Sequence, residues 1–396
     1  MNKSVLILLN LSIIVHRFTF SAAILDPNDF LALQSLRKSM EDMPGSTYFS
    51  SWDFTSDPCN FAGVFCSGDR VVTLNLGDPR AGAPGLTGRI DPDIGKLSNL
   101  VEFTIVPGRI IGALPATFSQ LKNLRFLGIS RNFISGEIPE SFGELKRLRT
   151  LDLSYNQLTG SLPWSVGSLT ALTNVVLCHN RFSGSIPTFA SQALNRLDLK
   201  HNNFSGPIPP GSLPSSLQYL SLSMNRFSGQ LDQLLPSLNN LNYLDLSMNR
   251  FTGLIPGSVF AFPITNLQLQ RNLFTGPVQP DNEVSIRTVD LSHNMLYGQV
   301  SPLFSTVENL YLNNNRFTGS VPSTLMDRLM AGSVQLLYLQ HNFLTAVPIN
   351  PMAEIPISSS LCLQYNCMVP PVQTPCPVEA GTQKTRPTSQ CMEWKG

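Results

Sequence analysis

The sequence predicts an α/β-type solenoid with a curved parallel β-sheet on its concave face and short 3-10 or loop segments on its convex face. Three observations lead to this fold class. Ten asparagines recur every 21 to 27 residues through the middle of the 396-residue chain. Each closes an L-x-x-L-x-L-x-x-N phrase, the pattern of the leucine-rich repeat. Cysteines stand in one group before and one group after this region, which indicates disulfide-bonded caps.

The repeated asparagines predict a ladder of side-chain hydrogen bonds. They are Asn132, Asn156, Asn180, Asn202, Asn225, Asn249, Asn272, Asn294, Asn315 and Asn342. An asparagine amide carries donors and an acceptor, so it can bond backbone groups of the adjacent turn. A core residue, often phenylalanine, follows two residues later, and a glycine then stands where the backbone turns back. We therefore expect the apolar frame residues to share one continuous core.

The chain begins with a predicted signal peptide, residues 1–23. Lys3 precedes an apolar stretch, and Ser21-Ala22-Ala23 fits a small-residue cleavage site. The stretch is too short to span a bilayer, and the last residues are polar. These features predict a secreted protein of the extracellular space or cell wall, without a membrane span.

Residues 24–70 are predicted to form an N-terminal cap. Asp26 suits the N-cap of a helix with Pro27 at its first position, and apolar residues then recur at helical spacing. Cys59 and Cys66 follow and are expected to form a disulfide. The cap is needed because the first repeat would otherwise expose a core edge.

Residues 71–345 are predicted to hold about twelve repeats, and residues 346–396 a cap rich in cysteine and proline. The rear cysteines allow three pairings, and the sequence does not choose among them: Cys362, Cys367, Cys376 and Cys391. Cys178 is left without a partner. Its place in the repeat should face outward, and a partly buried, inert thiol is the preferred interpretation.

Composition excludes several classes of function. Removal of Lys3 and Arg17 with the leader leaves 25 basic and 26 acidic residues, a formal charge of −1, so nucleic acid is not expected as a partner. No nucleophile elbow, glycine-rich phosphate loop or Cys/His metal spacing occurs in the sequence. We expect no enzyme activity, no cofactor and no metal.

Two motifs carry a resemblance to a known family. The phrase Asn-Arg-Phe-(Ser/Thr)-Gly-x-(Ile/Val)-Pro at 180–187 and 315–322 resembles the plant-specific leucine-rich repeat. The segment Trp52…Asp57-Pro58-Cys59…Gly63-Val64…Cys66 looks like the N-terminal cap of the same superfamily, with Phe61 where tryptophan is common. The chain is similar to receptor kinase and receptor-like protein ectodomains, to polygalacturonase-inhibiting proteins and to the repeat region of leucine-rich-repeat extensins. The resemblance implies extracellular recognition and does not specify the ligand.

Candidate ligand residues follow from the alternation of a β-strand. Side chains two and four residues before each asparagine should face out, and those that depart from the usual Leu-Asp-Leu-Ser phrase are the better candidates. These are Gln268, Gln270, Tyr311, Asn313, Tyr338 and Gln340. Tyr219 and Tyr243 lie two residues further back in their strands and should also face out. Tyrosine suits an interface because it has a rigid apolar body and a polar tip.

Basic residues flank the asparagines. Arg181, Arg226, Arg250 and Arg316 directly follow them, while Arg131 and Arg271 directly precede them. We expect these arginines along one edge of the concave face, where they could bind the carboxylates of a pectin-like polyuronate or an acidic protein. A parallel column of aspartates could neutralise part of this charge: Asp152, Asp198, Asp245 and Asp290.

Two further features complete the candidate sites. His179, His201, His293 and His341 each precede a ladder asparagine, which favours a pH response over a metal site because a coordination shell is missing. Asn203-Phe204-Ser205 is a glycosylation sequon.

The sequence thus predicts a recognition protein that binds a protein, peptide or receptor kinase in cell-surface signalling or defence. The alternatives are an inhibitor of a wall-degrading glycosidase such as polygalacturonase, and a structural cell-wall protein that binds pectin.

Overall fold

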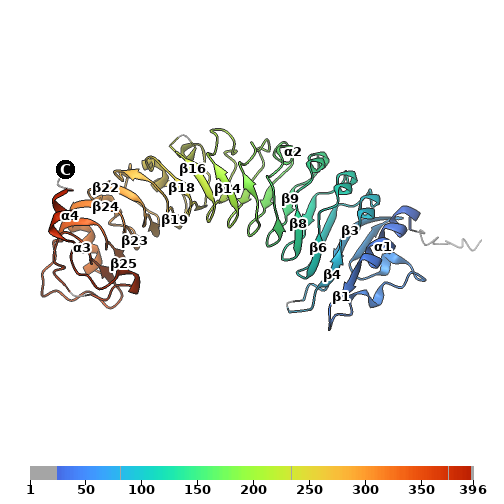
Figure 1. The fold of residues 1–396 in the computed structure, drawn as a ribbon, viewed down its shortest axis with the longest axis horizontal. Coiled ribbons are helices and arrows are strands. Elements are labelled where there is room, and N and C mark those ends of the chain that lie inside the picture. Colours follow the sequence, from blue (N-terminus) through green and yellow to red (C-terminus); the bar gives the residue numbers. More distant parts are fainter. Residues whose placement is uncertain (1–24, 81, 233, 373, 394–396) are drawn as a thin grey trace, which may run out of the picture.

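The computed structural model describes residues 25–393 except 81, 233 and 373. These residues form one curved rod that runs from the N-terminal cap to the C-terminal cap (Figure 1). The predicted solenoid with a concave parallel sheet is confirmed. The predicted signal peptide, residues 1–23, lies outside the described residues.

The concave side of the arc carries one sheet of fourteen strands. Strand β2 pairs antiparallel with β3, and every later neighbour is parallel. Frame leucines at the strand centres are buried, and their neighbours point into the trough. The strands are β2 (Val64–Ser67), β3 (Arg70–Leu76), β5 (Glu102–Ile105), β7 (Phe126–Gly128), β9 (Thr150–Asp152), β11 (Asn174–Val176), β13 (Arg196–Asp198), β15 (Tyr219–Ser221), β17 (Tyr243–Asp245), β19 (Asn266–Gln268), β21 (Thr288–Asp290), β23 (Asn309–Tyr311), β25 (Leu336–Tyr338) and β27 (Ser360–Cys362).

A second set of short strands follows the ladder asparagines and forms a lateral wall beside the trough. These strands make three smaller sheets, in the orders β1-β4-β6-β8-β10, β12-β14-β16-β18 and β20-β22-β24-β26. The strands are β1 (Met40–Asp42), β4 (Leu86–Arg89), β6 (Arg109–Gly112), β8 (Phe133–Gly136), β10 (Gln157–Leu158), β12 (Ser183–Gly184), β14 (Asn203–Gly206), β16 (Arg226–Gly229), β18 (Arg250–Phe251), β20 (Thr275–Gly276), β22 (Met295–Gly298), β24 (Arg316–Ser320) and β26 (Phe343–Ala346). Members such as β14, β16 and β18 lie side by side along the arc (Figure 1).

Short helical segments return the chain over the convex side, and α2 lies on the outer side of the arc (Figure 1). Proline precedes or opens most of them, since its φ suits a first turn. The α-helices are α1 (Pro27–Ser39), α2 (Trp164–Gly167), α3 (Ser323–Met330) and α4 (Thr388–Glu393). The 3-10 helices are η1 (Tyr48–Ser51), η2 (Pro58–Asn60), η3 (Pro92–Lys96), η4 (Ala116–Gln120), η5 (Glu140–Glu144), η6 (Leu235–Ser237), η7 (Gly257–Ala261), η8 (Pro302–Phe304) and η9 (Val378–Ala380).

The predicted asparagine ladder is present in atomic detail. The Oδ1 atom of Asn156 accepts from the N–H of Ile134 at 3.0 Å, and its Nδ2 donates to the carbonyls of Ile129 and Leu153 at 2.6 and 3.1 Å. The same three bonds recur in later coils, as at Asn249. Each ladder side chain thus satisfies buried backbone groups of two adjacent turns, which would otherwise cost stability.

Stacked phenylalanines fill the core between the concave sheet and the lateral wall. Phe182, Phe204, Phe227, Phe251 and Phe274 are at most 1 % exposed. Their successive ring centroids are 5.8, 5.9, 6.2 and 6.3 Å apart. Burial of each such ring contributes roughly 2–3 kcal/mol, so this spine holds the coils in register.

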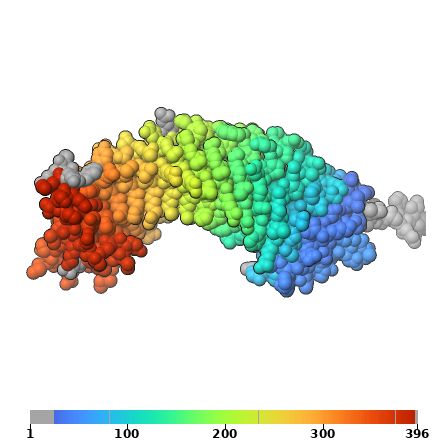
Figure 2. Space-filling view, viewed as in Figure 1, coloured from blue at the N-terminus to red at the C-terminus, as the bar shows by residue number. Residues whose placement is uncertain are grey.

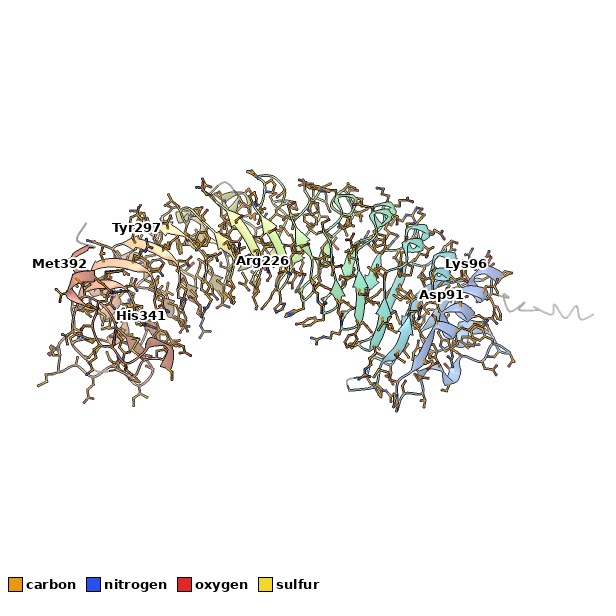
Figure 3. All side chains as sticks on the ribbon, in the orientation of Figure 1. Asp91, Lys96, Arg226, Tyr297, His341 and Met392 are labelled. Atoms are coloured by element: carbon orange, nitrogen blue, oxygen red, sulfur yellow. A yellow bond between two sulfur atoms is a disulfide. The ribbon has the colours of Figure 1, made fainter. Side chains whose placement is uncertain are left out.

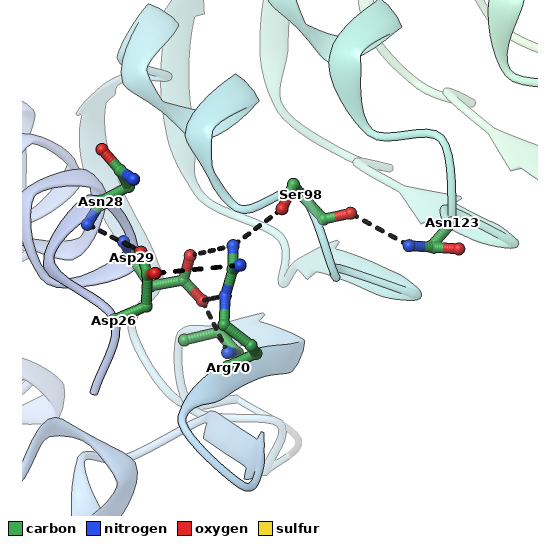
Figure 4. Close-up of polar contacts among 7 residues, drawn as sticks. Asp26, Asn28, Asp29, Arg70, Ser98 and Asn123 are labelled. Atoms are coloured by element: carbon green, nitrogen blue, oxygen red, sulfur yellow. Dashed lines mark hydrogen bonds and ion pairs between the residues drawn. The ribbon is translucent and has the colours of Figure 1, made fainter. Parts of the chain in front are cut away.

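The N-terminal cap is joined to the first coil by a buried ion pair (Figure 4). Asp29 is fully buried and accepts from Arg70 Nη2 at 2.8 Å and from the N–H of Val71 at 2.8 Å. The Oδ1 atom of Asp26 accepts from the N–H groups of Asn28 and Asp29, as a helix N-cap does. The predicted Cys59–Cys66 disulfide is present. Phe61 packs against Trp52 with ring centroids 5.4 Å apart, so phenylalanine takes a core role in this cap.

The repeat array continues beyond its predicted end at residue 345. Strand β27 extends the concave sheet, and Asn366 adds an eleventh member to the ladder through its bonds to Leu344, Leu339 and Leu363. The repeat phrase of this coil is interrupted by prolines and cysteines, so the period in the sequence does not reveal it. The two rear disulfides join Cys362 to Cys376 and Cys367 to Cys391, so they tie the last coil to the segment that covers it.

Candidate functional site

The middle of the trough carries a stacked pair of tyrosines. Tyr219 in β15 and Tyr243 in β17 are register partners, and their rings stack at 4.2 Å with planes 4° apart. Arg196 in β13 is the register partner of Tyr219 on its other side, and its guanidinium carbon lies 3.9 Å from the ring centroid. We call Arg196, Asp198, Tyr219 and Tyr243 the tyrosine platform. It brings together two predicted residues and two that were not proposed as ligand contacts.

Ionic and hydrogen-bonding contacts hold the tyrosine platform in one geometry. Arg196 Nη2 lies 2.8 Å from Asp198 Oδ2, and the Tyr219 hydroxyl donates to the same oxygen at 3.5 Å. Burial, followed by the nearby Asp198 carboxylate, raises the pKa of Tyr219. Burial and then Asp245 raise the pKa of Tyr243. Both phenols therefore remain protonated at physiological pH and can donate hydrogen bonds.

Polar atoms without internal partners lie beside the tyrosine platform. Ser221 lies between Asp198 and Asp245 in the strand register. Within the described residues, Ser221 Oγ, Ser223 Oγ and Arg196 Nε have no hydrogen-bond partner. Buried polar atoms of this kind cost free energy until they are bonded. Ser221 and Ser223 are at most 1 % exposed, so these atoms belong to the packing around the tyrosine platform rather than to its ligand-facing surface.

A second tyrosine pair lies further along the trough. Tyr311 in β23 and Tyr338 in β25 are register partners, with rings in an edge-to-face arrangement at 5.3 Å. Burial, then Tyr338 and Asp290, raise the pKa of Tyr311. These tyrosines are half-buried and reach the trough as predicted.

The amide side chains of this region are less accessible than predicted. Gln268 and Gln270 are half-exposed, but Asn313 and Gln340 are only 8 % and 4 % exposed. The prediction that the last two face solvent is wrong, because side chains of adjacent coils cover positions that alternation alone would expose. The Oε1 atoms of Gln270 and Gln340 have no hydrogen-bond partner in the part of the chain that the structure describes.

The aspartates of the predicted column form hydrogen bonds and an ion pair within the trough. Asp152, Asp245 and Asp290 accept hydrogen bonds from the backbone N–H groups of Ser154, Ser247 and Ser292 respectively. Burial raises the pKa of Asp290. Asp198 pairs with Arg196. The carboxylates thus have hydrogen-bond partners within the trough but keep their negative charge, and the charge of Arg271 opposes the rise in the pKa of Asp290. That the column neutralises part of the charge of the flanking arginines stays a prediction.

The flanking arginines lie outside the trough. Arg226, Arg250 and Arg316 open β16, β18 and β24 of the lateral wall, and Arg226 is labelled in Figure 3. Arg131 and Arg271 have left-handed backbone conformations, with φ of 54° and 56°, at the turn between the concave sheet and the lateral wall. The flanking arginines were predicted to lie along one edge of the concave face, but they form two rows. The chain turns at each ladder asparagine, so arginines before and after it lie on different sides of the turn. Whether these residues bind a ligand stays a prediction.

Each residue before a ladder asparagine has a left-handed backbone conformation, and we call this column the rim row. Tyr155, His179 and His201 stack along it, with centroid separations of 4.2 and 4.6 Å. Arg131 lies over the Tyr155 ring at 4.3 Å. Burial lowers the pKa of His179, and the neighbouring His201 lowers it further.

The other two histidines of the rim row have different surroundings. His293 faces the side-chain amide of Asn314 at 3.3 Å, and burial lowers its pKa. His341 Nε2 lies 3.0 Å from the carbonyl oxygen of Ala380 in the C-terminal cap. The four histidines therefore do not share one environment. Among residues 25–393, apart from the three omitted positions, no group of three or more His, Cys, Asp or Glu side chains could hold a metal ion.

Cys178 is buried and is the free cysteine of the described chain. Burial, followed by Asp198 and Asp152, raises the pKa of its thiol to about 12. The expectation that it faces outward is wrong, since it is only 9 % exposed between neighbouring coils. Its thiolate population at neutral pH is therefore small, and an inert thiol follows from its burial.

Asn203 is exposed at the start of β14, and Ser205 lies two residues later on the same strand. Alternation places both side chains on the outer face, away from the buried Phe204 ring. The geometry leaves room for a glycan, and glycosylation remains a prediction.

A hollow lies elsewhere, between the N-terminal cap and the first coil. It has a volume of about 770 Å³ and is lined in part by Tyr48, Phe65 and Arg80. The Tyr48 hydroxyl lies 2.6 Å from the carbonyl oxygens of both Ala62 and Asn75, and Arg80 pairs with Asp78. The polar groups of Tyr48 and Arg80 that line this hollow already have partners within the protein, so we place the candidate site in the trough.

Two contributors to the tyrosine platform, Arg196 and Asp198, were not proposed as ligand contacts from the sequence. Arg196 stands six residues before Asn202, the same offset as Tyr219 and Tyr243 from their asparagines. A comparison of that column across repeats could have found Arg196. The salt bridge to Asp198 depends on side-chain geometry that the repeat pattern does not encode.

Comparison with known proteins supports the repeat assignment. Residues 26–67 match the leucine rich repeat N-terminal domain. Residues 98–158 match the leucine rich repeat, as do 193–213, 216–238, 240–262 and 306–327. In the described residues, no helix is both long enough and apolar enough to cross a bilayer.

Similar proteins include plant receptor kinases. The chain is 36 % identical over 120 residues to the receptor-like kinase TMK4 of Arabidopsis thaliana, a match that spans 30 % of this chain and 11 % of TMK4. The crystal structure of PEPR1–AtPEP1 matches with a TM-score of 0.67 and 27 % identity, over 86 % of this chain and 52 % of that one.

The LRR ectodomain of the receptor kinase GASSHO1/SCHENGEN3 from Arabidopsis thaliana, in complex with CASPARIAN STRIP INTEGRITY FACTOR 2, shares the fold. Its TM-score is 0.62 at 24 % identity, and the match covers 86 % of this chain and 47 % of that one.

Proposed function

We propose that this chain, a leucine-rich repeat protein that resembles plant receptor ectodomains, is a non-catalytic recognition protein that binds an extracellular peptide or protein segment along its trough. The observation that carries this proposal is the tyrosine platform. Two stacked phenols and a guanidinium, held in one geometry at mid-trough, form a rigid and half-exposed aromatic and cationic surface.

The shape of the molecule supports an elongated ligand. The trough runs along the inner side of the arc, which Figure 2 shows as a filled surface. Strands in one sheet lie about 4.8 Å apart, so a ligand that contacts both Tyr243 and Tyr311 must bridge roughly 14 Å across β17, β19, β21 and β23. An extended peptide covers that distance with about four residues. A short peptide or an exposed loop is therefore long enough.

The chemistry of the trough supports a partner with hydrogen-bonding main chain and apolar side chains. Tyrosine rings contact apolar groups, while the half-exposed Gln268 offers an amide group for hydrogen bonds in the same trough. A shallow open surface of this kind does not exclude water as catalysis favours. The likeness to the PEPR1–AtPEP1 complex is consistent with recognition, and binding by the whole relatives does not transfer directly because this chain covers only part of them.

A peptide-display selection on the secreted protein tests the proposal. Peptides that bind wild type are measured by calorimetry against Tyr219→Ala/Tyr243→Ala and against Trp164→Ala on the convex side, where the side chain is 62 % exposed. We expect the double variant to lose affinity by roughly tenfold or more, since buried aromatic contacts often cost over 1 kcal/mol when truncated. The Trp164 variant should bind as wild type does.

Equal affinity of all three proteins would show that the tyrosine platform is not the binding site. Circular dichroism on each variant distinguishes loss of binding from loss of fold. Affinity purification from cell-wall extract, followed by mass spectrometry, then identifies the natural partner and tests whether the cell wall is its setting.

A further inference from the structure

We infer that the lateral wall is a second binding surface, which holds an acidic polysaccharide of the polyuronate type independently of the trough. The surface consists of the rim row together with the residues one and three positions after each ladder asparagine. Gly108 takes the place of the asparagine in the first of these coils. We call it the basic wall. It lies beside the trough and follows the whole array, and Arg226 and Tyr297 in Figure 3 belong to it.

Charge is segregated onto the basic wall. From the coil of Gly108 to the coil of Asn342, its three rows contain four histidines and seven arginines and no aspartate or glutamate. The formal charge of the chain without its leader is nevertheless −1, so the acidic residues lie on other surfaces. A one-sign surface on a nearly neutral protein creates a local field that attracts polyanions. The arginines are Arg109, Arg131, Arg181, Arg226, Arg250, Arg271 and Arg316.

The positive charge of the wall is available to a ligand. Arg109, Arg181, Arg226 and Arg250 are exposed, and none of them belongs to an ion pair within the described residues. The aspartate column lies on strands of the concave sheet, where its hydrogen-bond partners are serines and Arg196.

The spacing of the wall suits a regular polymer. Arg226 is the register partner of Ser205, and Arg250 is the register partner of Ser228. Each pair therefore places a guanidinium and a hydroxyl on neighbouring strands, roughly 5 Å apart. Guanidinium forks bind carboxylates in paired hydrogen bonds, and the hydroxyls can bond sugar hydroxyls between them.

The basic wall exposes large apolar side chains in other coils, such as Ile111, Phe133 and Leu273, but its middle part around Arg181 and Arg226 is poorly suited to a membrane. The outward positions of β12, β14 and β16 carry Ser183, Asn203, Ser205, Arg226 and Ser228, without a large apolar side chain. Stable attachment to a bilayer requires buried apolar area in addition to charge. A carboxylated polysaccharide requires only the hydrogen bonds and charge that the wall offers.

Binding of polygalacturonate by the full secreted chain tests this inference. We expect Arg226→Glu/Arg250→Glu to lower affinity at least tenfold, and Lys146→Glu/Arg147→Glu on the convex side, with the same change in net charge, to leave it near wild type. The wild-type affinity should fall by roughly tenfold between low and physiological salt because exposed charges are screened. Tyr219→Ala/Tyr243→Ala should bind the polymer unchanged, which separates this surface from the proposed peptide site.

Three outcomes would overturn the inference. They are equal binding by the two charge-reversal variants, equal binding of fully methyl-esterified polymer, and binding to anionic phospholipid vesicles without binding to polygalacturonate. Asn203→Gln, measured in parallel, shows whether a glycan between Arg181 and Arg226 obstructs the polymer. That variant should bind at least as tightly as wild type.

Discussion

At the scale of single residues, the ladder asparagine determines how each coil turns. Its side chain accepts from one coil and donates to carbonyls of two, as at Asn249. The residue before it is left with φ near +55°, a conformation that costs most L-residues energy and that asparagine, aspartate and histidine tolerate best. The four histidines of the rim row are consistent with this backbone requirement. Their recurrence therefore does not by itself indicate a site.

The ladder predicts a large cost for Asn249→Ala. The substitution leaves the buried N–H of Phe227 without its partner and removes one of the two bonds that the Leu222 carbonyl accepts, so we expect the free energy of unfolding to fall by about 1–3 kcal/mol. Denaturant titration measures it. Asn266→Ala, at an exposed position of β19, is the matched control and should stay within about 0.5 kcal/mol of wild type. Equal effects would mean that the ladder bonds contribute no net stability.

At the scale of elements, side chains on neighbouring strands form functional groups that no single strand contains. The tyrosine platform needs β13, β15 and β17, while the rim stack of Tyr155, His179 and His201 needs three consecutive turns. Contacts of this kind are rigid because each ring is held against the next. The elements therefore present preformed surfaces on both sides of the rim.

The rim stack predicts a specific dependence of stability on pH. Burial lowers the pKa of His179, so the folded protein binds its proton less readily than the unfolded chain. The contribution of neutral His179 to the free energy of unfolding is fully present above the ordinary histidine pKa, near 6.5. It is lost as the pH falls through the lower pKa that His179 has in the folded protein. His179→Asn keeps a residue suited to φ near +55° and removes the titration.

Thermal unfolding of wild type and His179→Asn between pH 7.5 and 5 measures this dependence. We expect the wild-type Tm to fall more steeply on acidification than that of the variant. His201→Asn serves as the comparison, because it removes the neighbour that lowers the pKa of His179. Parallel Tm curves for wild type and His179→Asn would contradict the assignment.

At the scale of the whole molecule, stability depends on covering both ends of an otherwise open array. The buried Asp29–Arg70 pair joins the first cap to the first coil, and two disulfides hold the last coil under the second cap. A solenoid coil contacts mainly its neighbours, so an uncovered end exposes its core. Both caps therefore stabilise the array by covering the core of its first and last coils.

A chain that ends at residue 346 should test the role of the last coil. It lacks β27 and Asn366, which removes the partner of β25 and exposes Leu337 and Leu344. We expect a lower Tm and concentration-dependent association on size-exclusion chromatography. Cys362→Ser/Cys376→Ser in the full chain keeps the coil and should remain monomeric while losing roughly 3 kcal/mol. A monomeric truncated protein with wild-type Tm would show that the array ends at 345.

Much of the fold was predictable because repeat chemistry is local. The asparagine and leucine period predicted the concave sheet and the ladder, the grouping of the cysteines predicted the front disulfide, and those predictions are confirmed. The end of the array was misplaced because Asn366 stands among prolines and cysteines that obscure its phrase. Of the candidate site, the two tyrosine pairs were predicted to face the trough, whereas Asn313 and Gln340 are covered by adjacent coils.

The sequence by itself determined that the protein is a solenoid, since each repeat carries the frame of apolar residues and the asparagine that build one coil. Only the tertiary structure decided which residues become neighbours across coils. Arg196 reaches Tyr219 while Arg226 lies on the outer wall, because lateral contacts depend on strand register and on the turn at each asparagine. Residues more than twenty positions apart are brought together by stacking, and the pattern within one repeat does not contain that information.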